Sequence, residues 1–147
     1  MSLTVRPIEA ADRLAWDALY AGYAEFYGVE QTQDMRDRVF GWLLEHAHEV
    51  NGFCVFHEGQ MVGFTHYRVF ARPLAAATGL YLDDLFVTPD ARGTGAAGAL
   101  IDAVRVEAEA QGHSVVRWIT AEDNARARGL YDKIADQTAW VTYDIKV

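Results

Sequence analysis

A glycine-rich stretch is the clearest candidate for chemistry in this sequence. Residues 91–99 read ARGTGAAGA and lead into an apolar-periodic segment that predicts a helix. Glycine and alanine leave backbone N–H groups open to a ligand, and a helix start adds the positive end of its dipole. The stretch therefore predicts a loop that binds a pyrophosphate. Its candidate binding residues are Arg92, Gly93, Thr94, Gly95, Ala96 and Ala97.

Two kinds of pyrophosphate loop fit these letters. Residues 93–98 satisfy G-x-G-x-x-G, the dinucleotide-binding pattern, and Glu122 lies somewhat beyond the offset expected for a ribose-binding acid. With Arg92 in front, the same letters satisfy R-G-x-G-x-A. The dinucleotide pattern needs a glycine almost directly after a strand, whereas residues 88–92 intervene here, and the preceding chain predicts antiparallel strands rather than βαβ units. These differences favour the second loop type.

Two adjacent carboxylates, Asp83 and Asp84, interrupt an apolar segment that predicts a strand. Neighbouring strand residues project to opposite faces of a sheet, so each carboxylate is expected to need water or a polar partner of its own. Cys54, the single cysteine, lies in the apolar run 53–56 and is expected to be a buried thiol rather than a nucleophile. The 5 histidines show no ligand spacing, so no metal site is expected.

The composition argues against several classes of function. A length of 147 residues predicts one domain, residues 1–147. The formal net charge of −8 repels phosphate backbones, so no nucleic-acid partner is expected, whereas polyamines and basic peptides would be attracted. No apolar stretch reaches the length of a signal peptide or a membrane span, which predicts a cytoplasmic protein without a membrane partner.

Alternating and helical patterns predict the elements that must position these residues. In chain order they are a strand at 4–7, helices at 9–27 and 31–47, strands at 53–57 and 61–70, a loop at 73–79, a strand at 80–87, a helix at 96–111, a strand at 115–120, a helix at 124–135 and a strand at 140–147. This order predicts an α/β (α+β) fold with one mixed central β-sheet and helices on both faces.

Two motifs at a defined separation resemble a known family. Residues 81–101 read YLDDLFVTPDARGTGAAGALI, a strand that ends in V-x-P before an R-x-x-G-x-A loop. Residues 124–131 read NARARGLY and satisfy N-x-x-A-x-x-L-Y. Together they resemble the acetyl-CoA-binding core of the GNAT acetyltransferase superfamily over residues 80–135. After Tyr131 the chain lacks the family's usual Y-x-x-x-G-F continuation, so a different connection into the last strand is expected.

The resemblance implies a single GNAT-type domain that uses acetyl-CoA as co-substrate and no metal. The family's parallel strands 4 and 5, here 80–87 and 115–120, would splay apart to admit it. The strand before the loop would bind the pantetheine arm and the acetyl carbonyl through its backbone. The implied cofactor-binding residues outside the loop are Leu85, Phe86, Val87 and Asn124. Tyr131 takes the family's general-acid position, where a phenol protonates the departing thiolate.

The residues expected to contact the acceptor amine are predicted from a narrower resemblance. Residues 82–87, LDDLFV, resemble the L-E-D-F-F-V strand of diamine and polyamine N-acetyltransferases, whose first acid lies in the acceptor cleft. Asp83 takes that position as a base, directly or through water, with a structural salt bridge as the alternative. Asp84 is expected to be structural. In the family the first two helices and their loop cover the acceptor site, so Tyr27 and Glu30 are expected to touch the acceptor.

The predicted function is an acetyl-CoA-dependent N-acetyltransferase that acts directly on a primary amine, such as a small polyamine-like or other cationic acceptor. Two alternatives stay open at this point. One is an enzyme that acetylates protein or peptide amines, and the other is a non-catalytic module that binds acyl-CoA. Family members often form dimers, so a homodimer stays open as well.

Overall fold

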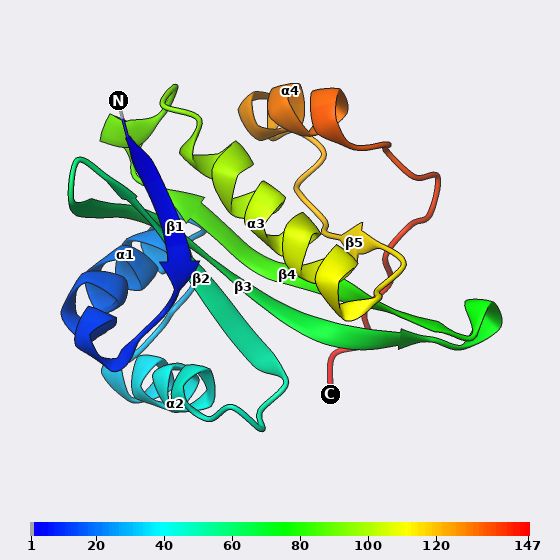
Figure 1. Ribbon diagram of the computed structural model, residues 1–147, viewed down its shortest axis with the longest axis horizontal. Helices are drawn as coiled ribbons and strands as arrows, with labels where there is room; N and C mark the ends of the chain where they lie inside the picture. Colours follow the sequence, from blue (N-terminus) through cyan, green and yellow to red (C-terminus); the bar gives the residue numbers. More distant parts are fainter. Residues whose placement is uncertain (1) are drawn as a thin grey trace.

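A mixed five-stranded sheet organises the chain in a computed structural model that describes residues 2–147 (Figure 1). The strand order is β1-β2-β3-β4-β5, and only the pair β4–β5 is parallel. The strands are β1 (Leu3–Pro7), β2 (Val50–His57), β3 (Gln60–Arg72), β4 (Ala77–Val87) and β5 (Val116–Arg117). The helices are α1 (Arg13–Phe26), α2 (Gln33–Leu44), α3 (Ala96–Gln111) and α4 (Ala125–Ile134), with 3₁₀ turns η1 (Ala10–Asp12), η2 (Pro73–Ala75) and η3 (Pro89–Ala91).

Helices cover both faces of the sheet, as predicted (Figure 1). On one face, Leu100 of α3 packs into a buried cluster with Leu80 of β4. On the other face, Trp16 of α1 and Phe40 of α2 pack with Phe64 of β3. Because both faces of the central strands are buried, their sequences are nearly continuous apolar runs rather than alternating ones. The expected mixed α/β sheet with two covered faces is therefore confirmed.

Helix α3 is flanked by a glycine at each end, at the predicted residues. Gly95 at its N-cap and Gly112 at its C-cap have φ of +87° and +78°, in the left-handed region that glycine adopts without strain. Other boundaries differ from the prediction. The second helix ends at Leu44 rather than 47, because Glu45 is extended. Most of the predicted loop at 73–79 is the turn η2 and the start of β4, which lengthen the β3–β4 hairpin.

A bulge in β4 decides which face its carboxylates take. The register of β3 against β4 shifts at this point and leaves Asp83 without a partner opposite. Leu82 and Leu85 both pack on the α3 side, although residues three apart in a regular strand face opposite sides. The prediction that Asp83 and Asp84 face opposite sides is therefore wrong. The bulge turns both carboxylates into one cavity beside α1 and α2.

The C-terminal part of the chain departs furthest from the prediction. β5 covers Val116–Arg117 rather than 115–120, and it pairs with β4 only opposite Leu80 and Tyr81. Beyond that point the two parallel strands diverge, which confirms the expected splay of strands 4 and 5. The predicted strand at 140–147 is wrong, because this segment pairs with no strand among residues 2–147 and its apolar side chains are exposed.

Candidate active site

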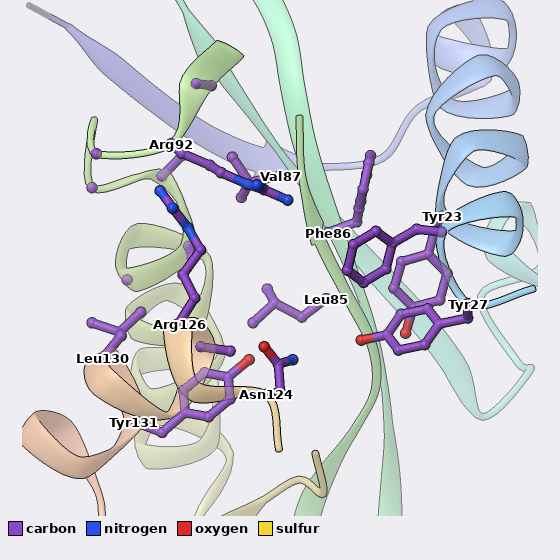
Figure 2. Close-up of a pocket in the computed structure, with 18 residues that line it drawn as sticks. Tyr23, Tyr27, Leu85, Phe86, Val87, Arg92, Asn124, Arg126, Leu130 and Tyr131 are labelled. Atoms are coloured by element: carbon purple, nitrogen blue, oxygen red, sulfur yellow. The ribbon is translucent and has the colours of Figure 1, made fainter. Parts of the chain in front are cut away.

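The divergence of β4 and β5 opens a cavity of about 420 Å³ between β4, α4 and the end of α1 (Figure 2). Its walls are Tyr23, Phe26, Tyr27, Leu85, Phe86, Val87, Ala91, Arg92, Gly93, Gly95, Ala96, Ala97, Gly98, Asn124, Arg126, Ala127, Leu130 and Tyr131. Every residue predicted to bind acetyl-CoA lies in this wall except Thr94. The Thr94 hydroxyl instead donates to the Ala91 carbonyl at 2.6 Å and closes the loop.

The glycine loop lines one end of this cavity with backbone donors. Gly93 and Gly95 have φ of +83° and +87°, conformations that a larger residue would strain. Helix α3 begins directly afterwards, so the N–H groups of Ala96 and Ala97 stand among those that a helix leaves without an internal acceptor. An anion at this end would meet these donors and the helix dipole.

Two guanidinium groups extend to the same end of the cavity. Figure 2 shows Arg126, from the first turn of α4, extending toward the glycine loop, and Arg92, from the loop, extending toward Val87. Neither forms an ion pair with a carboxylate within residues 2–147. The sequence analysis missed Arg126, although its place inside the N-x-x-A motif two residues after Asn124 was an available signal. Together the two cations favour a polyanionic ligand such as a pyrophosphate.

The predicted acid Tyr131 lies at the opposite end from the loop. Its ring packs edge-on against Trp118, with 5.3 Å between ring centroids, and this contact holds the hydroxyl toward Leu85 and Asn124 (Figure 2). Burial raises the pKa of Tyr131, and the nearby Tyr27 hydroxyl raises it further. The phenol therefore stays protonated at neutral pH and is available as a proton donor. Tyr27 lines the same cavity, and its contact with an acceptor stays a prediction.

A second cavity, of about 250 Å³, lies on the α1–α2 side of β4 and holds both carboxylates of the bulge. It is lined by Tyr20, Val39, Trp42, Glu49, Val50, His66, Arg68, Asp83 and Asp84. Asp83 therefore does not line the first cavity. Glu30, the other predicted acceptor residue, lines neither cavity, because it lies in the exposed connection between α1 and α2.

Asp84 is held by a buried hydrogen-bond network. The Trp16 indole N–H donates to His66 Nε2 at 2.9 Å, which leaves the ring proton on Nδ1. That Nδ1–H donates to Asp84 Oδ2 at 2.8 Å, and the Tyr20 hydroxyl donates to the same oxygen at 2.9 Å. Burial opposes ionisation of Asp84, but the contacts with His66, Tyr20 and Tyr23 outweigh it and lower its pKa. Asp84 is therefore a fixed negative charge.

Asp83 has a different environment from its neighbour. The Arg68 Nε donates to both of its carboxylate oxygens, at 3.0 and 3.2 Å, and the two side chains are 34% and 36% exposed. Burial raises the pKa of Asp83 and the Arg68 charge opposes the rise, with a net shift upward. A carboxylate with a raised pKa is a better proton acceptor than an ordinary aspartate.

The two cavities lie next to each other. Tyr23 lines the first cavity, and Asp84, whose charge acts on the Tyr23 hydroxyl, lines the second. Burial, with the Asp84 charge next in size, raises the pKa of Tyr23. The carboxylate cavity thus adjoins the end of the first cavity where Tyr23 and Tyr27 face the strand residue Phe86 (Figure 2).

Other reactive side chains lie outside both cavities. Cys54 is fully buried, and burial together with the nearby Asp12 charge raises the pKa of its thiol to about 12, which keeps it an unreactive thiol. Among residues 2–147, no three histidine, cysteine, aspartate or glutamate side chains are grouped as a metal site would require. Over the same residues, no helix is both long and apolar enough to cross a membrane.

Two curated relatives match nearly the full chain. The D-amino-acid N-acetyltransferase HPA3 of Saccharomyces cerevisiae is 30% identical over 96% of this chain and 89% of its own length. The uncharacterized N-acetyltransferase YhfO of Bacillus subtilis is 29% identical over 99% of this chain and 98% of its own.

Solved structures and a family model agree with these relatives. AAC(6')-Iy in complex with the bisubstrate analog CoA-S-monomethyl-acetylneamine has the same fold, with a TM-score of 0.85, 18% identity, and coverage of 100% of this chain and 99% of that one. A ribosomal-protein-alanine N-acetyltransferase from Brucella melitensis biovar Abortus 2308 aligns with a TM-score of 0.80 and 24% identity, over 99% of both chains. The Acetyltransferase (GNAT) family model matches residues 16–135. This chain therefore belongs to the GNAT acetyltransferase family, whose members use acetyl-CoA.

Proposed function

We propose that this chain transfers the acetyl group of acetyl-CoA directly to the amine of a small molecule. One observation carries the proposal. The first cavity joins a loop of backbone donors and two arginines at one end to the Tyr131 hydroxyl at the other, and the carboxylate cavity adjoins it. An acyl transfer to an amine needs these three parts: an anchor for the donor, an acid for the leaving group and a site for a cationic acceptor.

The residues present fit acetyl-CoA at the loop end. A Cβ added at Gly93 would meet nothing within 4 Å, and one at Gly95 only Leu3 Cδ1 at 3.9 Å, so open space faces the loop. The N–H groups at the start of α3, with Arg92 and Arg126, would hold the pyrophosphate. The Thr94 side chain would not bind the ligand, because its hydroxyl donates to the Ala91 carbonyl within the loop.

The strand edge fits the pantetheine arm. β4 pairs with β5 only opposite Leu80 and Tyr81, so the backbone groups of Leu85, Phe86 and Val87 on that edge have no strand partner. Buried backbone N–H and C=O groups need hydrogen bonds, and an extended amide chain can supply them as a strand would. Asn124, at the start of α4, lies across the cavity from this edge.

Proton transfers are assigned to two side chains. Acetyl-CoA supplies an activated acetyl group on a thioester, and its sulfur leaves as a thiolate that needs a proton. Tyr131 donates that proton, because its raised pKa keeps the phenol protonated in the working range. The attacking amine must lose a proton, and Asp83, with its raised pKa and partial exposure, takes it directly or through water. Asp84 supplies the fixed charge that attracts the cationic amine.

An amino acid is the acceptor class that we favour. The related HPA3 is named a D-amino-acid N-acetyltransferase. In this chain the carboxylate cavity also holds one cation, Arg68, beside Asp83 and Asp84. Two carboxylates for an ammonium group and one guanidinium for a carboxylate are complementary to a zwitterion. Polyamines lack the carboxylate, and a protein amine would have to enter a cavity of about 250 Å³.

The test is turnover with acetyl-CoA and a panel of D- and L-amino acids, diamines, polyamines and short peptides, followed by release of free thiol. We expect turnover with amino acids. Arg68→Gln should lower kcat/KM at least 10-fold more for amino acids than for amines without a carboxylate, since one charge-assisted pair contributes about 1.5–3 kcal/mol. Turnover of polyamines or peptides alone would contradict the amino-acid assignment.

Binding without turnover would identify the non-catalytic acyl-CoA module instead, so calorimetry with acetyl-CoA accompanies the assay. Gly95→Val should abolish binding. Gly112→Val is its control, because it strains the same left-handed conformation at the far end of α3, away from the cavity. A protein that binds NADH more tightly than acetyl-CoA would refute the whole proposal.

A further inference from the structure

The carboxylate cavity has two walls of different chemistry. Strands β3 and β4 carry its charged side chains, which are Arg68, Asp83 and Asp84. Helix α2 and the first residue of β2 carry its apolar side chains, which are Val39, Trp42 and Val50. A ligand that fills this cavity therefore meets charge on one side and hydrocarbon on the other.

The charged wall decides how an amino acid would lie in the cavity. Its ammonium group belongs beside the carboxylates of Asp83 and Asp84, and its carboxylate beside the Arg68 guanidinium. The guanidinium is held in place, because Arg68 Nε donates to Asp83 at 3.0 Å and the guanidinium carbon lies 4.9 Å from the centre of the Tyr81 ring. Both charged groups of an amino acid are attached to one carbon. With both of them on this wall, the side chain of the amino acid points away from β3 and β4, toward α2.

Trp42 is the largest side chain on the α2 wall, and its ring has a fixed position. The indole stacks on the His48 ring, with 4.9 Å between the ring centroids and 6° between the planes. His48 is fixed in turn, because its Nδ1 accepts a hydrogen bond from the Val50 backbone N–H at 3.1 Å. Trp42 belongs to neither core cluster of residues 2–147. An aromatic ring that borders a cavity and packs in neither cluster is available to a ligand.

Aliphatic side chains continue the same wall. Val39 lies about one helical turn before Trp42 on α2, so both side chains fall on one face of the helix. Val50 lies opposite Arg68 in the register of β2 against β3, so it extends the apolar wall up to the charged one. These aliphatic groups offer no hydrogen bond. A polar ligand side chain would lose its water here without compensation.

A further acid lies at the rim of the cavity. Glu49 is exposed and forms no ion pair with a basic side chain among residues 2–147. It adds a third carboxylate to a cavity whose one guanidinium, that of Arg68, is already paired with Asp83. A ligand side chain that ends in a carboxylate would therefore be repelled.

We propose that the acceptor amino acid carries an uncharged apolar side chain, and that Trp42 and Val39 determine this specificity by packing against it. The inference rests on the proposed function, since it needs an amino acid in the carboxylate cavity. Each methylene group that packs on this wall raises kcat/KM about 2- to 4-fold, because it stays out of water in the transition state as well. Glu49 acts against acidic side chains of the same length.

The first test measures kcat/KM for glycine, alanine, 2-aminobutyrate, norvaline and norleucine, in the enantiomer that turns over. We expect a rise of about 2- to 4-fold for each added carbon. Glutamate, whose side chain has as many carbons as that of norvaline, should lie about 10-fold or more below norvaline. Glu49→Gln should raise kcat/KM for glutamate about 2- to 5-fold relative to norvaline, since an exposed charge pair contributes an effect of this size.

The second test repeats the series in three variants. Trp42→Ala should lower the norleucine-to-glycine ratio of kcat/KM about 10-fold or more, whereas Trp42→Phe should keep most of this ratio. Leu44→Ala is the matched control, because Leu44 lies on the same helix and lines neither cavity, and it should keep the wild-type ratio. A ratio within one variant is independent of how much of the protein is folded.

The outcomes distinguish this inference from the proposed function. Turnover of amino acids with a flat series, with a preference for glutamate, or with a norleucine-to-glycine ratio that Trp42→Ala leaves intact would overturn the specificity and leave the proposed function standing. If no amino acid turns over, the proposed acceptor class is refuted, and the inference is refuted with it.

Discussion

Replacing Asp84 by asparagine is expected to destabilise the fold far more than the same change at Asp83. Asp84 accepts hydrogen bonds from His66 at 2.8 Å and Tyr20 at 2.9 Å in a partly buried site. A hydrogen bond to a charged group contributes about 1.5–3 kcal/mol, against about 1 kcal/mol for a neutral pair. Loss of the charge on two such bonds therefore costs about 1–4 kcal/mol. At about 2–4 °C per kcal/mol for a chain of this size, the melting temperature should fall by about 2–16 °C.

Asp83→Asn removes a partly exposed ion pair with Arg68, of a kind that contributes about 0–1 kcal/mol. Its melting temperature should therefore stay within about 4 °C of the wild type. For kcat/KM we expect the opposite order: its pH dependence should change more in Asp83→Asn than in Asp84→Asn. A proton acceptor contributes about 10²-fold or more, so kcat/KM of Asp83→Asn should fall by about 10²-fold near pH 6. The loss should shrink toward pH 9, where more amine is already neutral.

Calorimetric melting and kcat/KM profiles of both variants, with one amine, check this reasoning. Equal losses of melting temperature would refute the buried-network account of Asp84. An unchanged pH profile for Asp83→Asn would refute its role as base. If Asp84→Asn, still folded, instead lost its activity most strongly at the acidic end, the base would be Asp84.

Three further outcomes are expected. Tyr131→Phe should lower kcat by about 10²–10³-fold with acetyl-CoA affinity nearly unchanged, whereas the control Tyr67→Phe, a buried tyrosine outside both cavities, should keep wild-type kcat. Cys54→Ala should retain turnover, since the thiol pKa is raised to about 12; loss of kcat in a folded protein would indicate an acyl-enzyme route. The hydrogen bonds from Arg6 lower the pKa of Asp12 below 3.8, so the stability from this pair is present above that pH and is lost as the pH falls through the folded-state value. Acid unfolding of Asp12→Asn should accordingly lack this component.

The sequence alone determined the loop, the two motif helices and the family. These features rest on local rules. Glycines in the left-handed region flank α3 (Ala96–Gln111), and a short motif places Asn124 at the N-cap of α4 and Tyr131 within that helix. A local backbone conformation or a helical period is written in neighbouring residues, so it can be predicted without knowledge of distant contacts. The splay of the two parallel strands followed from the resemblance carried by the same motifs.

The tertiary structure alone decided the side of the site that we propose for the acceptor. The bulge that turns Asp83 and Asp84 into one cavity arises from the register of β4 against β3. The residues near the bulge carry no sequence pattern that predicts it. The position of Arg126 near the glycine loop requires α4 to lie over that loop, and the segment 140–147 has strand composition whether or not an edge accepts it. Pairing, register and the meeting of distant side chains depend on the whole chain, because their free energy comes from contacts between residues far apart in sequence.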